Sequence, residues 1–355
     1  MPSYSALEAI SPAIARTQRM LFSPFRKGRT WKLAATAYLS MVGWGFFPFP
    51  LIYLAFLPMV RSRAGNSVAV AFIVGILLLC ALFVWIFYLC SRLQFAFFDM
   101  VLNRGEFVTP AWRKYARPSR RWTLFKLLFG MVFTALFAAP IASYALHILP
   151  LLTSMKPNQP PPPQLFAAVF AGYGLVLLCF GSFGAVSLLL SDFIVPSLAL
   201  EDTSLSEAFL RMGRLIRNEP GQFAAYAFTK IGLGIVAYIG ATFALEITLL
   251  LSALIIGALA FAIGFALHMI GVPILVLTGL GIVLAIAFYL FFLGYVLLLF
   301  LGPVLTFLQA YTLYFLAGRY PLLGDLLQAS EPPPPDYLAP ASYLPPSPLP
   351  PPFAG

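Results

Sequence analysis

The sequence predicts an all-α integral membrane protein, a polytopic helical bundle of about six transmembrane helices. Of its 355 residues, 61% are apolar and only 10% are charged, whereas about a quarter of the residues in a soluble domain are charged. The apolar residues form long runs, and roughly 20 such residues are enough for one helix to cross a bilayer. Eighteen of the 22 Lys and Arg residues lie in alternate gaps between these runs. This is the pattern that basic cytoplasmic loops leave in a membrane protein.

Residues 1–32 form a basic segment without an uninterrupted apolar core, so no cleavable signal peptide is expected. Ser11 and Pro12 are a favourable N-cap and first helical residue. We expect a surface helix to follow them, with Arg16 and Arg19 on one side.

The first apolar run covers residues 33–60 and is interrupted by Gly43, Gly45, Pro48 and Pro50. We expect one kinked span, because spanning helices tolerate such residues where neighbouring helices satisfy the backbone. A re-entrant pair of helices is the alternative.

Three further spans are expected over residues 67–90, 127–152 and 165–190. The helix of the first of these should continue beyond the membrane, because Arg92, Asp99 and Asn103 form one polar stripe at helical spacing. The last of the three is expected to close at Asp192.

Residues 231–318 contain no Lys or Arg, and Glu246 is their only acid. We expect two long spans here, at about 222–253 and 275–318, joined by an apolar segment that dips into the membrane. Gly271–Pro273 is the best break, because Gly and Pro interrupt helices. Four spans in this stretch, giving eight in all, are the alternative.

Both span counts are even, so both termini are placed on the cytoplasmic side. With six spans, eighteen basic residues fall in cytoplasmic gaps and three in outer gaps, as the positive-inside rule requires. The chain then divides into a basic cytoplasmic segment (1–32), a transmembrane domain (33–320) and a cytoplasmic Pro-rich tail (321–355). Residues 331–355 contain 11 prolines, which favours polyproline II or disorder.

Residues 204–218 are expected to form an amphipathic helix. Ser204 and Glu207 have the spacing of a capping box. Apolar residues follow at helical spacing on one face, and Arg211 and Arg214 lie on the other. A short basic helix of this kind lies either in the headgroup plane or flat on the protein's own cytoplasmic surface.

Ionisable residues inside spans are functional candidates because inserting them is costly. Lys230 is expected to extend its side chain to the cytoplasmic headgroups, and Glu246 to lie near the outer interface, hydrated or bonded to another helix. Asp192 can pair with Lys230 or with Arg211 across helices. The candidate polar contacts are therefore Asp192, Lys230, Glu246, Arg211 and Arg214.

No catalytic residue, metal site or cofactor is predicted. The sequence contains no HExxH, CxxC, GxSxG or P-loop motif, and its three cysteines lie inside apolar runs. His147 and His268 are the only histidines. They could ligate a haem or a pigment, but without a supporting motif we interpret them as interfacial residues.

Two stretches resemble a known family. Residues 11–33, SPAIARTQRMLFSPFRKGRTWKL, are a basic helix running into the first span. Residues 191–228, SDFIVPSLALEDTSLSEAFLRMGRLIRNEPGQFAAYAF, are a span end, an Asp/Pro turn and an amphipathic helix. Together they resemble an uncharacterised family of bacterial polytopic membrane proteins that is distantly similar to the membrane domain of some glycerophosphodiester phosphodiesterases. The resemblance implies six helices over most of residues 11–320. It implies no reaction, because the catalytic metal-binding domain of those enzymes is absent.

The function that we expect is that of a non-enzymatic scaffold or accessory subunit of a larger complex in the bacterial cytoplasmic (inner) membrane. Few intramembrane charges, 35 Phe residues and the Pro-rich tail favour it, because preformed polyproline II segments bind at a low ordering cost. The alternative is a lipid or amphiphile transporter or binding protein, in which kinked helices line a cavity.

The expected partners are other membrane protein subunits and anionic lipid headgroups. Each Lys or Arg near such headgroups contributes about 1 kcal/mol. We do not expect nucleic acid to be a partner despite the net charge of +10, because the basic residues flank the apolar runs.

Overall fold

The structure is a computed structural model that describes residues 3–22, 27–45, 57–105, 107–153, 163–201, 203–271 and 273–330. Every regular element in these ranges is a helix, which confirms the all-α prediction. Pro48, Pro50 and the Pro-rich residues 331–355 lie outside the described residues.

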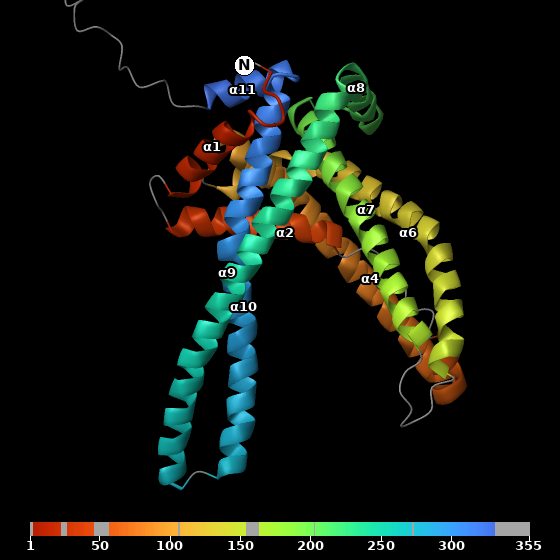
Figure 1. Cartoon of the computed structure of the whole chain (residues 1–355), viewed down its shortest axis with the longest axis vertical. Coiled ribbons are helices and arrows are strands. Elements are labelled where there is room, and N and C mark those ends of the chain that lie inside the picture. The colour runs from red at the N-terminus through yellow and green to blue at the C-terminus, as the bar shows by residue number, and fades with distance from the viewer. Residues whose placement is uncertain are drawn as a thin grey trace, which may run out of the picture.

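The helices form a packed head from which two arms diverge (Figure 1). The head contains three short helices and the adjoining ends of the longer ones. The short helices are α1 (Ile10–Phe22), α8 (Leu205–Asn218) and α11 (Pro321–Ala329). The first arm contains α4 (Leu57–Asn103), α6 (Ala116–Thr153) and α7 (Pro163–Glu201), and the second contains α9 (Pro220–Met269) and α10 (Ile274–Ala317). The remaining helices, α2 (Lys27–Gly45) and α5 (Val108–Lys114), pack against α4.

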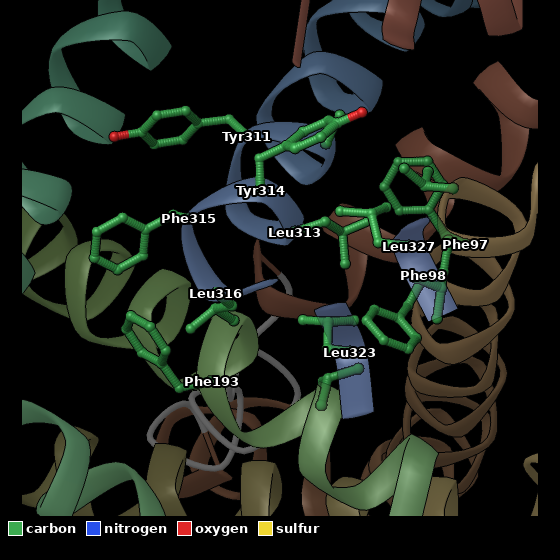
Figure 2. Close-up of a cluster of buried hydrophobic side chains, with 14 of the residues drawn as sticks. Phe97, Phe98, Phe193, Tyr311, Leu313, Tyr314, Phe315, Leu316, Leu323 and Leu327 are labelled. Carbon is green, nitrogen blue, oxygen red and sulfur yellow. The ribbon is translucent and has the colours of Figure 1, made fainter. Parts of the chain in front are cut away.

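The hydrophobic core lies in the head and surrounds the end of α10. Consecutive residues of α10 from Ala310 to Ala317 are buried, as expected for a helix that is apolar on all sides. Figure 2 shows Phe98 of α4 and Leu323 of α11 on one side of this helix, and Phe193 of α7 on the other. The core thus joins helices from both arms.

Five helices of the described residues are long and apolar enough to cross a membrane, over residues 65–103, 116–150, 163–201, 220–269 and 285–317. The fold is therefore compatible with a helical membrane bundle. The first predicted span, residues 33–60, is not among the five. Of its described residues, 33–45 lie in α2, which crosses the head instead of following an arm (Figure 1), and 57–60 begin α4.

The last two long helices differ from the arrangement predicted for residues 222–318. α9 is continuous to Met269, so the expected dipping connector is mostly helical. This stretch of α9 has no proline to break it. The chain reverses at the predicted break, where Gly271 has a φ of 93° that glycine adopts at little cost. The described residues contain two helices here rather than four.

α7 does not close at Asp192, contrary to the prediction. It continues through Pro196 to Glu201. Proline inside a helix removes one backbone hydrogen bond. Here the residues around it, Phe193 to Leu198, are buried in the head, and we infer that this packing offsets the loss. α4 does continue to Asn103, as its polar stripe predicted.

The three short helices of the head bury more surface than the sequence predicted. α1, expected on the surface, has Arg16, Met20 and Leu21 fully buried. The apolar face of α8 packs on the core of the head, as its second interpretation, packing on the protein's own surface, predicted. Residues 321–329, assigned to the tail, form α11, whose Leu323 and Leu327 are four residues apart and buried.

Candidate functional site

Four polar side chains meet in the interior of the head. The Nζ atom of Lys230 on α9 lies 2.6 and 2.7 Å from the two carboxylate oxygens of Asp192 on α7. The same atom lies 2.6 Å from Oγ1 of Thr312 on α10. The hydroxyl of Tyr226 lies 2.8 Å from Oδ2 of Asp192 and 2.8 Å from Oγ1 of Thr312. All four residues are at most 5% exposed, and we call them the polar cluster.

Local helix geometry positions these side chains. Tyr226 and Lys230 are four residues apart on α9, so they lie on one face. On α10, the hydroxyl of Thr312 donates to the carbonyl of Leu308 one turn earlier, at 3.0 Å. Asp192 reaches the cluster because α7 continues past it into the head.

The ion pair in the polar cluster is neutral overall and saturated by its own partners. An ammonium group has three protons, and the two carboxylate oxygens and Thr312 accept all three. Burying a charge costs several kcal/mol, which is recovered only when the pair is completely hydrogen-bonded. The cluster therefore ties α7, α9 and α10 together and leaves no proton of Lys230 for a substrate.

Aromatic rings enclose the polar cluster. The ring of Tyr226 stacks on Tyr311 with centroids 5.3 Å apart, and on Phe315 at 4.3 Å. Phe193 packs at 5.5 Å and, in Figure 2, lies on the same side of α10 as Phe315. Because the four side chains are buried, the local dielectric is low and the hydrogen bonds among them are stronger.

The structure brings together two of the predicted polar residues, Asp192 and Lys230. The expectation that Lys230 extends to the headgroups is wrong, because its Nζ atom is directed to Asp192 and the side chain is 3% exposed. Arg211 instead pairs with Glu201, which also accepts a hydrogen bond from Tyr320 at 2.6 Å. Burial, together with this bond to Glu201, raises the pKa of Tyr320.

The other predicted residues lie away from the polar cluster. Arg214 is exposed on α8, and Glu246 is exposed on α9. His147 on α6 and His268 at the end of α9 are exposed and belong to different arms (Figure 1), so they do not share a ligand. Within the described residues, no group of three or more His, Cys, Asp and Glu side chains could hold a metal ion.

Two further buried cations were not singled out from the sequence. The guanidinium of Arg16 donates to the carbonyl of Val101 at 2.9 and 3.1 Å and to that of Leu102 at 2.6 Å. It thereby caps the C-terminal end of α4, where carbonyls lack helical partners and a cation is favoured. Lys126 on α6 is 1% exposed, with its Nζ atom 4.7 Å from the ring centre of Phe87. Nothing in the sequence marks these contacts, because the acceptors are backbone atoms and a ring far along the chain.

In the part of the chain that the structure describes, these features define a helical protein with five potential membrane spans and a buried ion pair at the base of its arms. The chain belongs to a family of unknown function, DUF7544, whose family model matches residues 4–326. The match includes the head and both arms, and it confirms the expectation of an uncharacterised family. No curated protein and no solved structure matches the chain.

Proposed function

We propose that the protein is a non-enzymatic scaffold or accessory subunit of a membrane protein complex. The length of the second arm carries this proposal. Residues 231–269 of α9 contain one charged residue, Glu246. At about 1.5 Å per residue they extend about 58 Å, whereas the hydrocarbon core of a bilayer is about 30 Å thick.

Tilting the helix does not remove the difference between the length of the apolar stretch and the thickness of the hydrocarbon core. A helix tilted by about 40°, the upper end of the usual range, crosses the core in about 39 Å, or about 26 residues. About a third of the apolar stretch then lies beyond the hydrocarbon. Its exposed side chains include Leu259, Phe261, Phe265 and Met269. So large an apolar surface marks a protein contact, and we assign it to another membrane protein subunit.

The polar cluster supports a structural role rather than catalysis or transport. Its donors are used within the protein, and it joins α7 of the first arm to α9 and α10 of the second. A fixed junction of this kind sets the angle at which the arms are presented to a partner.

We place the complex in the bacterial cytoplasmic membrane, with the head and both termini on the cytoplasmic side. This orientation follows from the positive-inside bias. Exposed cations at the start of α6, Arg117, Arg120 and Arg121, then face anionic headgroups. The distant similarity to the membrane domain of glycerophosphodiester phosphodiesterases is part of the same proposal and concerns architecture alone.

Two matched pairs of phenylalanines test the proposal. Phe261 and Phe265 are exposed near the tip of the second arm, and Phe166 and Phe170 are exposed on α7 of the first. Each pair is replaced by alanine in the full-length protein, which is purified in mild detergent, and co-purifying proteins are quantified by mass spectrometry. We expect a stoichiometric partner with the unaltered chain and with the Phe166/Phe170 variant, and severalfold less with the Phe261/Phe265 variant.

A partner-free, monodisperse protein that carries only lipid would contradict the scaffold function and favour the lipid-binding alternative. Equal partner recovery with both variants would contradict the assignment of the contact to the second arm. A chain that ends at Ser330 tests separately whether the Pro-rich residues contribute to partner binding.

A further inference from the structure

A groove of about 460 Å³ opens beside the polar cluster. This volume lies within the range of about 300–1,000 Å³ that is typical of small-molecule sites. Four helices line it, with residues widely separated in the sequence. These are Tyr38 and Met41 of α2, Leu188 of α7, Lys230, Ile231, Gly234, Ile235 and Tyr238 of α9, and Leu301, Val304, Leu305 and Leu308 of α10.

The open side of the groove faces the surroundings of the arms. Met41, Ile235 and Tyr238 line it and are each more than half exposed. Residues 230–238 lie within the candidate span 220–269. Acyl chains are therefore the medium in contact with this opening when the second arm is in a membrane.

The charged and polar groups in the lining of the groove indicate which class of ligand it can bind. The groove has one side chain that is charged at neutral pH, Lys230, and its three protons are accepted by Asp192 and Thr312. An anionic ligand would therefore have to displace Asp192, leaving a buried carboxylate without its cation at a cost of several kcal/mol. The other polar side-chain atoms are the hydroxyls of Tyr38 and Tyr238. The lining is complementary to an uncharged hydrocarbon chain.

We propose that this groove is a binding site for one acyl chain of a membrane lipid, seated between α2 and the second arm. Through this site a lipid fills the space at the base of the arm. The proposal goes beyond the scaffold function and does not depend on it, because no protein partner lines the groove.

Glycines on α9 provide a matched test. A Cβ atom at Gly234 would lie 4.0 Å from Cδ1 of Leu308, which is ordinary contact, and a longer side chain there would enter the groove. A Cβ atom at Gly240, on the same helix outside the groove, would meet nothing within 4 Å. The variants Gly234→Leu and Gly240→Leu are therefore prepared as purified full-length proteins in nanodiscs that contain a phospholipid with a diazirine in its acyl chain.

After photolysis, cross-links are mapped by mass spectrometry. We expect labelling of residues 301–308 to exceed that of the exposed parts of α10 and to fall severalfold in Gly234→Leu, with no change in Gly240→Leu. A second matched pair, Ile235→Trp in the groove and Ile247→Trp outside it, keeps the test informative if Gly234→Leu does not fold. Uniform labelling along α10, or equal labelling in both members of a folded pair, would overturn the proposal. Because no partner protein is present, these outcomes are independent of the scaffold test.

Discussion

Lys230 is stable in the interior of the head because Asp192 and Thr312 accept all its protons. Removing one member of such a buried pair leaves an uncompensated charge, which costs more than the pair contributes as a whole. The two members are therefore expected to be strongly coupled, and this coupling can be measured separately from their individual effects.

Substitution of Lys230 by methionine should destabilise the protein by about 3–5 kcal/mol, because the carboxylate of Asp192 then stays buried without a cation. The double variant Lys230→Met/Asp192→Asn should recover most of this loss, since its carboxamide is neutral. Unfolding midpoints in detergent for the unaltered protein, Lys230→Met, Asp192→Asn and the double variant measure the coupling. A double variant no more stable than Lys230→Met would contradict the ion-pair account.

Among individual residues, the sequence identifies as candidates those whose chemical type differs from that of their neighbours along the chain. Asp192 and Lys230 were recognisable as partners because both are charged groups next to apolar runs. Tyr226 and Thr312 were not, because tyrosine and threonine are common in such helices and only the packing of α7, α9 and α10 brings them together. The burial of Arg16 was not predicted for a similar reason, because its hydrogen-bond acceptors are backbone carbonyls of α4, which is distant in the sequence.

Helices α2 and α10 cross at Gly302. A Cβ atom built on Gly302 would come within 2.8 Å of Cα of Ala34, so only glycine allows this approach. The crossing holds α2 across the base of the second arm, where Tyr38 and Met41 of the same helix line the groove.

The variant Gly302→Ala should therefore lose about 1–3 kcal/mol through overpacking. The matched variant Gly294→Ala, on the same helix, has nothing within 4 Å of the added Cβ atom. It should be neutral or more stable by about 0.5–1 kcal/mol, because alanine restricts the unfolded chain more than glycine does. Thermal unfolding of both variants checks whether their stability changes differ as predicted. A Gly302→Ala variant that is more stable than the unaltered protein would show that the two helices do not cross this closely.

The start of α8 should depend on pH through Glu207. Its carboxylate accepts a hydrogen bond from the backbone N–H of Ser204 at 2.9 Å. This bond, followed by the one involving the Ser204 side chain, lowers the pKa of Glu207 below its ordinary value of 4.5. A carboxyl group whose pKa is lowered by folding stabilises the fold above its unfolded pKa, and this stabilisation is lost as the pH falls through the folded pKa.

Amide exchange at the start of α8, corrected for the intrinsic rate, should therefore lose protection as the pH is lowered below 4.5. The variant Glu207→Gln should not show this change, because its amide retains an acceptor but does not titrate in this range. The same loss of protection in both proteins would assign the effect to another group.

Local signals explain which elements were predictable. The α8 helix begins at a capping box within its own sequence, so the position of its start followed from a few neighbouring residues. The continuity of α9 did not, because a helix that is apolar on every side has no periodicity to mark its limits. The extension of α7 beyond Asp192 depends on burial in the head, which is set by distant helices.

The molecule as a whole concentrates its internal packing in the head and leaves its arms largely uncovered. Each candidate span contains an apolar segment of 18 residues. No residue of this segment is buried within the protein in α9, and at most 17% of its residues are buried in any other candidate span. Lipid covers such surfaces within a bilayer, but the second arm is longer than a bilayer can cover even when it is tilted. This difference between the length of the second arm and the thickness of the bilayer is the physical reason for proposing a protein partner.

The most direct test measures where the second arm leaves the membrane. Single cysteines are placed at the exposed positions Ile239, Phe243, Phe261 and Phe265 of α9, in a chain whose three native cysteines are replaced by alanine. Each variant is treated with a water-soluble maleimide in nanodiscs and in native membranes. We predict slow reaction at Ile239 and Phe243 in both, and fast reaction at Phe261 and Phe265 in nanodiscs that becomes slow in native membranes, where the partner covers them. Slow reaction at all four positions in nanodiscs would contradict the account, because the bilayer alone would then cover the whole arm.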